Sequence, residues 1–227
     1  MMKYVITGTS SGLGFILAKN FTRKNEYVVG ISRSIGKAES LTKNEHFSHV
    51  RIDLARINNS KNLKKALAKL RAVIDDGPFI LILNAATFYA GEERITDRRL
   101  SELFNVNVFS SMILVEELSN LNLRRILVIN SISGLIGQSQ QHEYCASKHA
   151  LMGFTRSLIK SAKNSNYDVM CINPGGMKTE LWTDYETVKT DDFLEGETVA
   201  DICESLISIP QRCFIENMPI LPPSDIN

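Results

Sequence analysis

A tyrosine and a lysine lie four residues apart in the segment Tyr144-Cys145-Ala146-Ser147-Lys148. Because residues four apart in a helix lie one turn apart on the same face, this spacing places a phenol beside an ammonium group. A free phenol has a pKa near 10 and is a poor general acid or base at neutral pH. A cation about 4 Å away contributes on the order of 4 kcal/mol at an effective dielectric near 20, enough for the roughly 3 pKa units required. The pair therefore predicts proton-transfer chemistry in a partly dry pocket.

The same interval recurs at Tyr185 and Lys189, so the spacing alone does not identify a site. That second pair lies in a Thr- and Asp-rich stretch with no buried strand leading to a pocket, and we predict solvated or lid residues there. Tyr144 differs because Ser131 and Gly134 precede it, at the end of an apolar strand and in its loop. Parallel sheets present ligand-binding groups at this end of their strands. We therefore predict Tyr144 and Lys148 as catalytic residues.

A glycine-rich segment joins the first predicted strand to the first predicted helix. Glycines at such a turn permit tight geometry and let the backbone approach a pyrophosphate. The amide N–H groups at the helix N-terminus face the anion, and serine hydroxyls add neutral donors. We predict a phosphate-binding loop whose cofactor contacts are Gly8, Ser10, Ser11, Gly12, Leu13 and Gly14.

The end of the second predicted strand bears on the choice of cofactor. An NAD site usually places an Asp or Glu there to hold the ribose hydroxyls. Here residues 30–34 read GISRS and contain an arginine in place of a carboxylate. Arg33 is suited to pair with a 2′-phosphate, to which Ser32 or Ser34 can donate. This predicts NADP(H), with NAD(H) as the alternative if Arg33 is an incidental surface residue.

Short apolar runs alternate with helical patterns along the whole chain. Strands are predicted over Lys3–Thr7, Tyr27–Ser32, Val50–Asp53, Phe79–Leu83, Arg125–Asn130, Val169–Asn173 and Cys213–Glu216. Helices are predicted near Gly12–Arg23, Asn59–Ile74, Asp97–Leu118, Glu143–Ala162 and Val199–Ile207. Uniformly apolar strands indicate a parallel sheet buried on both faces, and the alternation predicts one doubly wound α/β domain over residues 1–227. The tail from Pro219 to Asn227 is predicted to be partly loose.

Bulk composition argues against several classes of protein. Lys and Arg number 26 against 25 Asp and Glu, and this net charge of +1 gives no field that recruits nucleic acid or an anionic membrane. The four cysteines form no C-x-x-C pair, and no His cluster has metal-ligand spacing, so we predict free thiols in a reducing cytosol and no metal site. No apolar run approaches the roughly 20 residues that cross a bilayer, and no signal peptide is expected. The prediction is a soluble, cytoplasmic protein.

In order and spacing, these motifs resemble those of the classical short-chain dehydrogenase/reductase family over essentially the full chain. The resemblance is carried by the glycine motif at 7–14 and by Asn107, Ser131, Tyr144, Lys148 and Pro174-Gly175. It implies a Rossmann-type, seven-stranded parallel sheet ordered 3-2-1-4-5-6-7, with helices on both faces. It also implies a homodimer or homotetramer that pairs through the fourth and fifth helices.

The resemblance further implies a role for each matching residue. Tyr144 would pass a proton to or from the substrate oxygen, which Ser131 would hydrogen-bond. Lys148 would bind the nicotinamide ribose and lower the Tyr144 pKa, while Asn107 would hold a water connecting Lys148 to solvent. The remaining implied cofactor contacts are Asp53 and Leu54 at the adenine, Asn84, Ala85 and Ala86 beyond the fourth strand, and Pro174, Gly175, Gly176, Met177 and Thr179 at the carboxamide and phosphates.

Two departures from the family pattern concern pocket shape. The usual Asn-Asn-Ala-Gly after the fourth strand reads Leu83-Asn84-Ala85-Ala86, and the Ala86 methyl is expected to tighten the cofactor or substrate space. The C-terminus lacks the common glycine-rich ending, and the segment 178–197 is short for a substrate lid.

Several site residues also have a purely structural interpretation. Ser131 can be an ordinary strand-end serine, Asn107 can bridge backbone within its helix, and Asp53 can close a turn. Trp182 and Tyr185 can pack a lid without touching substrate.

The function predicted from these residues is NADPH-dependent hydride transfer between nicotinamide and a small carbonyl or alcohol substrate. The segment 138–142, which reads QSQQH just before Tyr144, hints at a polar substrate such as a sugar or a pterin-like ring. Two alternatives stay open: a catalytically silent cofactor-binding sensor or scaffold, because fold alone does not establish function, and an NAD-dependent alcohol dehydrogenase. The complete set of Asn107, Ser131, Tyr144 and Lys148 favours an enzyme, since a pure binder has no chemical need for all four.

Overall fold

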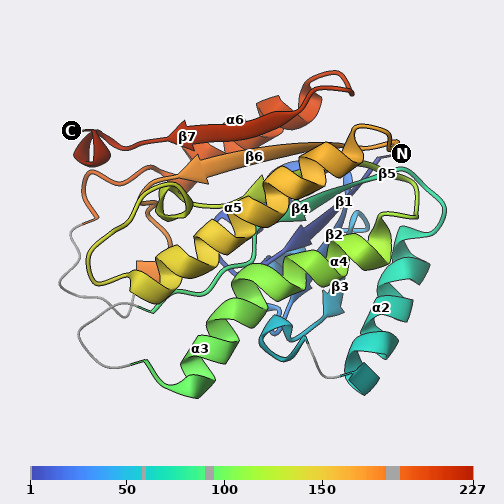
Figure 1. Ribbon diagram of the computed structural model, residues 1–227. Coiled ribbons are helices and arrows are strands. Elements are labelled where there is room, and N and C mark those ends of the chain that lie inside the picture. The colour runs from blue at the N-terminus through green and yellow to red at the C-terminus, as the bar shows by residue number, and fades with distance from the viewer. Residues whose placement is uncertain (1, 58–59, 90–94, 183–189, 227) are drawn as a thin grey trace.

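The computed structural model describes residues 2–57, 60–89, 95–182 and 190–226. Within these ranges, parallel strands form a seven-stranded sheet in the order β3-β2-β1-β4-β5-β6-β7 (Figure 1). The strands are β1 (Lys3–Thr7), β2 (Tyr27–Ser32), β3 (Phe47–Arg51), β4 (Phe79–Leu83), β5 (Leu123–Ile129), β6 (Asp168–Pro174) and β7 (Ile215–Ile220). This order confirms the predicted fold class.

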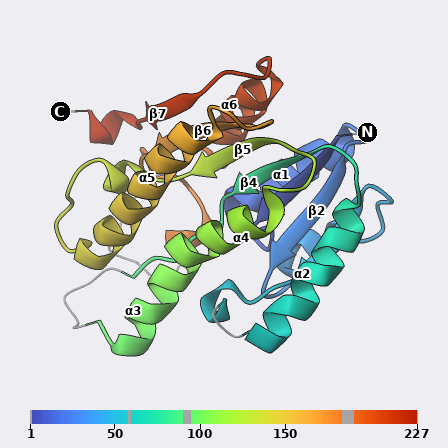
Figure 2. The same ribbon diagram turned by 45° about the vertical axis from the view of Figure 1, so that its right-hand side comes forward.

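Helices cover both faces of the sheet (Figures 1 and 2). They are α1 (Gly12–Arg23), α2 (Ser60–Ile74), α3 (Asp97–Phe104), α4 (Ser110–Leu118), α5 (His142–Ala162) and α6 (Gly196–Ser208). Alternate strand residues face opposite sides: Val5 packs in the core shared with α2, α4 and α5, whereas Ile6 packs in the core shared with α1 and α6. The sheet is therefore buried between two helical layers, as its apolar strands predict.

The edge strands differ from their predicted bounds. β3 ends at Arg51 because Asp53 leaves the sheet and caps the short 3-10 helix Leu54–Arg56, accepting a hydrogen bond from the Ala55 N–H at 3.2 Å. β7 begins later and runs further than predicted, because an outermost strand tolerates the missing N–H of Pro219. Part of the tail predicted to be partly loose lies in regular structure, since Pro219 and Ile220 pair with β6 in β7 and a 3-10 helix follows at Pro223–Asp225.

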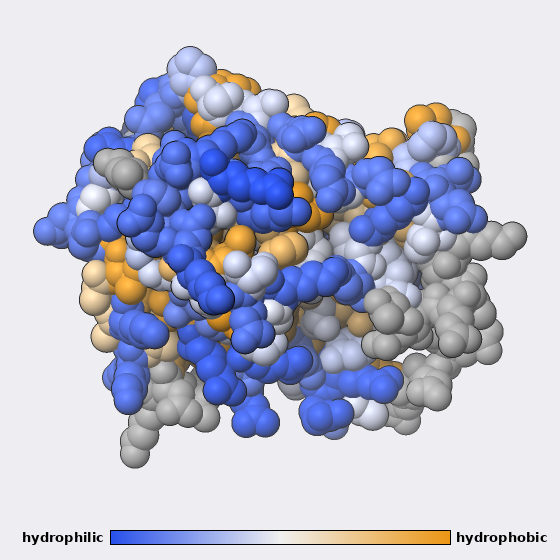
Figure 3. Space-filling model, turned by 180° about the vertical axis from the view of Figure 1, so that it is seen from behind, coloured by the Kyte–Doolittle hydropathy of each residue, from blue (hydrophilic) through white to orange (hydrophobic). Residues whose placement is uncertain are grey.

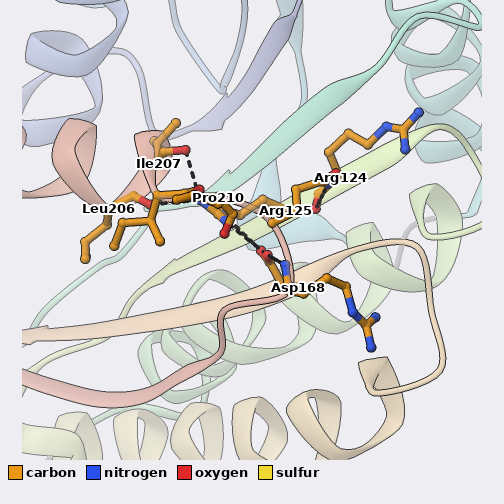
Figure 4. Close-up of polar contacts among 9 residues, drawn as sticks. Arg124, Arg125, Asp168, Leu206, Ile207 and Pro210 are labelled. Carbon is orange, nitrogen blue, oxygen red and sulfur yellow. Dashed lines mark hydrogen bonds and ion pairs between the residues drawn. The ribbon is translucent and has the colours of Figure 1, made fainter.

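A buried ion pair ties β5 and β6 to the end of α6 (Figure 4). The Arg125 guanidinium and the Asp168 carboxylate form a two-pronged pair, at 2.6 Å and 2.8 Å, between side chains that are at most 2% exposed. The same guanidinium donates to the backbone carbonyls of Leu206, Ile207 and Ile209. A cation at a helix C-terminus satisfies carbonyls that the helix leaves open. This contact fixes α6 against the sheet.

The surface opposite to the view of Figure 1 is mainly hydrophilic, and hydrophobic residues form separate small patches on it (Figure 3). Among the described residues, no helix has the length and apolar character needed to cross a membrane.

Candidate active site

The glycine loop follows β1 and leads into α1, as predicted. Gly8 and Gly12 have φ angles of 77° and 54°, which favour glycine. A Cβ at Gly14 would overlap the carbonyl oxygen of Gly8. The hydroxyl of Thr7 accepts hydrogen bonds from the backbone N–H groups of Asn84 and Ala85, at 2.9 and 3.0 Å, and so ties this loop to the end of β4. The result is a narrow, bare stretch of backbone at the N-terminus of α1.

Not every residue of the predicted loop presents its side chain to a ligand. Leu13 is 3% exposed and packs in the core beneath α1, so only its backbone is available. Ser11 has an extended backbone immediately before α1. The side-chain amide of Asn84 donates to the Thr7 carbonyl at 2.9 Å, which gives this residue a role in holding β1 and β4 together.

A cavity of about 180 Å³ lies beyond β2 and β4, where the adenosine end of a dinucleotide is expected. Its lining brings together the predicted residues Gly8, Ser10, Arg33, Asp53, Leu54, Ala85 and Ala86. Sequence analysis missed Glu102, which also lines the cavity and places Oε1 3.9 Å from the nearest guanidinium nitrogen of Arg33. Nothing in the spacing of Glu102 from the motifs signals this position, because α3 delivers it from 69 residues beyond Arg33.

The predicted catalytic residues Ser131 and Tyr144 follow the end of β5 and lie in the first turn of α5, respectively. Figure 1 shows the two elements. The Ser131 hydroxyl hydrogen-bonds the Tyr144 side chain and also accepts from the Ser133 N–H at 3.1 Å. Lys148 is buried, with Nζ 5.7 Å from the centre of the Tyr144 ring and 3.3 Å from the Asn130 carbonyl. The predicted pair therefore shares one face of α5, where Tyr144 lines a pocket and Lys148 is buried behind it.

The structure contradicts the predicted lowering of the Tyr144 pKa. Burial raises the pKa of Tyr144 to about 12, and the Ser131 hydrogen bond offsets only part of this. Burial also lowers the pKa of Lys148 to about 8. Taking either group out of water penalises its charged form, and the Lys148 ammonium is aimed at a backbone carbonyl rather than at the phenol. The Tyr144 phenol therefore holds its proton tightly.

Asn107 lies in a π-helical turn, Asn105–Phe109, between α3 and α4, where sequence analysis predicts one continuous helix. Its side-chain oxygen accepts from the Thr87 N–H at 2.8 Å, while its amide donates to the Thr87 carbonyl and the Ser147 hydroxyl, both at 3.0 Å. Ser147 in turn donates to the Tyr144 carbonyl at 2.8 Å. Asn107 thus joins the chain beyond β4 to the first turns of α5. π-turns of this kind are frequent at functional sites.

A second cavity of about 180 Å³ opens above Ser131 and Tyr144. It is lined by the predicted segment Pro174, Gly175, Gly176, Met177 and Thr179, together with Gln138 and Gln141. The lining also contains residues that sequence analysis missed, among them Phe88, Phe193 and Asp225. Phe88 packs edge-on against Tyr144 with ring centroids 4.8 Å apart, and Trp182 lies between Phe88 and Phe193 at 5.0 and 5.3 Å. Tyr185 and Lys189 fall outside the described residues.

The comparisons with known proteins agree with this geometry. The family model for short chain dehydrogenase matches residues 3–189. The chain belongs to this family. Membership makes it an oxidoreductase with a nicotinamide-binding, Rossmann-type fold.

Relatives in the family have diverse activities. A 3-oxoacyl-(acyl-carrier-protein) reductase of Chlamydia trachomatis is 26% identical, over 92% of this chain and 85% of that protein. A diacetyl reductase, (S)-acetoin forming, of Staphylococcus epidermidis is 28% identical, over 84% of this chain and 78% of that protein. Among solved structures, a 4-hydroxyisoleucine dehydrogenase mutant complexed with NADH and succinate superposes with a TM-score of 0.86, at 24% identity, over 99% of this chain and 100% of that chain. At this identity the superposition supports the fold alone.

Proposed function

We propose that this short-chain oxidoreductase is an NADPH-dependent reductase of small carbonyl compounds, reversible toward the alcohol, with Tyr144 as the proton donor. The observation that carries the proposal is that Ser131 and Tyr144 line one pocket and are hydrogen-bonded to each other, with Lys148 buried against the Tyr144 ring. A sensor or scaffold of the same fold has no chemical use for a buried phenol hydrogen-bonded to a serine. The reductase therefore explains the site better than the silent binder.

The residues present fit a dinucleotide cofactor. The left-handed backbone of Gly8 and the overlap that any side chain at Gly14 would produce leave the loop open to a pyrophosphate. Backbone N–H groups at the start of α1 favour an anion there. When bound, the nicotinamide supplies the hydride that adds to the carbonyl carbon. The adenosine end is assigned to the cavity with Arg33, Asp53 and Leu54.

The raised pKa of Tyr144 suits this residue to the role of proton donor. A phenol with a pKa of about 12 is protonated at neutral pH and can give its proton to the substrate oxygen as the carbonyl is reduced. Ser131 is placed to hydrogen-bond the same oxygen. Lys148 is placed beneath the Tyr144 ring, where a positive charge favours the phenolate that reduction leaves. Asn107 acts as a positioning residue, through Ser147.

The preference for NADPH rests on Arg33, whose side chain is 68% exposed at the mouth of the adenosine cavity. A guanidinium matches the geometry of a phosphate. Glu102 supplies the observation that favours the alternative, because a carboxylate near Arg33 competes with a 2′-phosphate and suits ribose hydroxyls. An NAD-dependent dehydrogenase is therefore the second candidate.

The cavity above Tyr144 suits a small substrate with one flat face and one polar end. Aromatic walls from Phe88, Trp182 and Phe193 offer apolar contact, and Gln138 and Gln141 offer hydrogen bonds. This lining supports the predicted polar carbonyl substrate.

We also propose that the protein works in the cytoplasm as a homodimer or homotetramer formed through α4 and α5. Phe109, next to α4, leaves 40% of its surface exposed, which is consistent with a partner on this side. Sedimentation of Phe109→Asp beside the wild type tests the assembly, and an unchanged mass would remove this face from it.

The central experiment measures NADPH and NADH binding by fluorescence titration and then NADPH oxidation against a panel of polar and apolar carbonyls. Tyr144→Phe should bind NADPH as the wild type does and lose turnover by about 10²- to 10⁴-fold. Tyr167→Phe, which alters a buried tyrosine between α5 and β6, is the matched control. Failure of the wild type to bind either nucleotide would contradict the proposal, and equal turnover in both variants would remove Tyr144 from the chemistry.

A further inference from the structure

An acidic side chain of this protein occupies an anion-binding position at the start of α1. Glu180 begins the short 3-10 helix Glu180–Trp182, far along the chain from the glycine loop. Its Oε2 accepts a hydrogen bond from the Gly12 N–H at 2.9 Å, and its Oε1 pairs with the Lys37 ammonium. Exposed N–H groups at a helix N-terminus attract anions. The carboxylate therefore stands where the proposed cofactor would bring a phosphate.

Lys37 is attached to the loop by its own backbone. Its N–H donates to the Ser10 carbonyl at 2.8 Å. The preceding Gly36 has a φ of 53° and lies so close to Ser10 that a Cβ would overlap the Ser10 carbonyl. These backbone contacts hold Lys37 beside the loop and do not depend on the Glu180 side chain.

The surroundings of this contact are basic and open. A cavity of about 730 Å³ beside α1 is lined by Gly12 and Glu180, by four cations, Lys19, Arg23, Lys37 and Lys178, and by one further carboxylate, Glu197. Partial burial opposes ionisation of Glu180, but the hydrogen bonds from Lys37 and from backbone N–H groups hold the pKa of the carboxyl below its usual range. Glu180 is therefore an anion in this structure, and its removal leaves an electropositive position.

We propose that Lys37 is a cofactor-phosphate ligand and that Glu180 is an internal competitor for the same position. The inference rests on the proposed function and adds two residues to its binding site. Two anions repel at this separation, so entry of a diphosphate exchanges the Glu180 carboxylate for a phosphate oxygen on Gly12 and Lys37. No covalent bond changes in the exchange.

The exchange links the cofactor site to the substrate cavity. Trp182 ends the same 3-10 helix as Glu180 and packs between Phe88 and Phe193 in the cavity wall. Release of Glu180 frees this helix to shift, and the wall above Tyr144 shifts with it. Cofactor binding thus shapes the substrate cavity.

The test uses 2′-phospho-ADP-ribose, which carries the diphosphate without the nicotinamide. Calorimetric titration should show Glu180→Gln binding about tenfold more tightly than the wild type, the change expected for a charge-assisted hydrogen bond. Adding Lys37→Met to Glu180→Gln should weaken binding by a similar factor. Glu195→Gln, which removes the same charge from the nearby exposed pair with Lys178, is the matched control and should change affinity less than about twofold.

Trp182 is the single tryptophan of the chain, so its emission reports the 3-10 helix directly. Binding of 2′-phospho-ADP-ribose should shift the Trp182 emission in the wild type and in Glu195→Gln. In Glu180→Gln the carboxylate is already absent, so the same ligand should shift the emission little. Equal or weaker binding by Glu180→Gln would overturn the inference while leaving the proposed function intact. Absence of NADPH binding in the wild type and in Glu180→Gln alike would overturn the proposed function itself.

Discussion

The ammonium of Lys148 lies 5.7 Å from the centre of the Tyr144 ring and donates to the Asn130 carbonyl at 3.3 Å. Both side chains are buried, and burial moves the pKa of each toward its neutral form, to about 12 for Tyr144 and about 8 for Lys148. Tyr144 and Lys148 are thus arranged for proton transfer, and burying the Lys148 charge lowers the free energy of unfolding.

The first prediction concerns that cost. The folded pKa of Lys148 is about 8, below the ordinary 10.5, so between these values the unfolded chain binds more protons and stability rises with pH. Below pH 8 Lys148 is protonated in both the folded and the unfolded chain, and burying its charge lowers the free energy of unfolding by its full amount, on the order of 3 kcal/mol. Lys148→Met removes the charge and should raise Tm at pH 7 by roughly 5–10 °C, with the gain shrinking toward pH 10. Thermal scans across this range measure it.

Lys160→Met, at an exposed position on the same helix, is the control and should show little change at either pH. A gain for Lys148→Met that is the same at pH 7 and pH 10 would mean that packing, not charge, sets the difference.

The second prediction concerns Arg33. Arg33→Ala should weaken NADPH binding by roughly 10- to 100-fold, the worth of a charge-assisted hydrogen bond, and leave NADH binding nearly unchanged. Glu102→Gln removes the competing carboxylate and should tighten NADPH several-fold. Parallel titrations of both nucleotides measure the ratio. Equal losses for NADPH and NADH in Arg33→Ala would contradict a contact with the 2′-phosphate.

The third prediction concerns the glycine loop. Gly14→Ala places a methyl group against the Gly8 carbonyl and near the Asn84 amide, so the loop must open. We expect a loss of about 1–3 kcal/mol in the free energy of unfolding together with loss of dinucleotide binding. Gly137→Ala meets nothing within 4 Å and should leave both unchanged. Chemical denaturation and titration check the pair, and normal binding by Gly14→Ala would show that the loop has space to spare.

The fourth prediction concerns the Arg125–Asp168 pair. Asp168→Asn leaves a buried guanidinium without its counter-charge and should lower the free energy of unfolding by about 3–5 kcal/mol. Arg156→Met, which breaks an exposed pair with Glu216, should cost less than about 1 kcal/mol. Urea denaturation at pH 7 measures both. Similar costs for the two variants would indicate that water reaches the Arg125 guanidinium.

Strand order and the placement of Tyr144 and Lys148 on one helix could be predicted from the sequence because both depend on local pattern. Runs such as Phe79–Leu83 are apolar throughout, and Tyr144 and Lys148 lie on one helix. The sign of the Tyr144 pKa shift could not be predicted, because it depends on how much water the fold leaves around two side chains. The positions of Glu102 and Glu180 depend on contacts between distant segments, which no spacing in the chain records.

The π-turn at Asn105–Phe109 has a consequence for how this chain can change in evolution. A π-turn accommodates one more residue than a regular helical turn, so deleting one residue there would let α3 and α4 join as a regular helix with little rotation of the residues beyond it. Leu114 and Leu118 would then keep their places in the core that they share with the sheet. The core would therefore tolerate a shortening by one residue, whereas the site would lose the wide turn that presents Asn107 to Thr87 and Ser147.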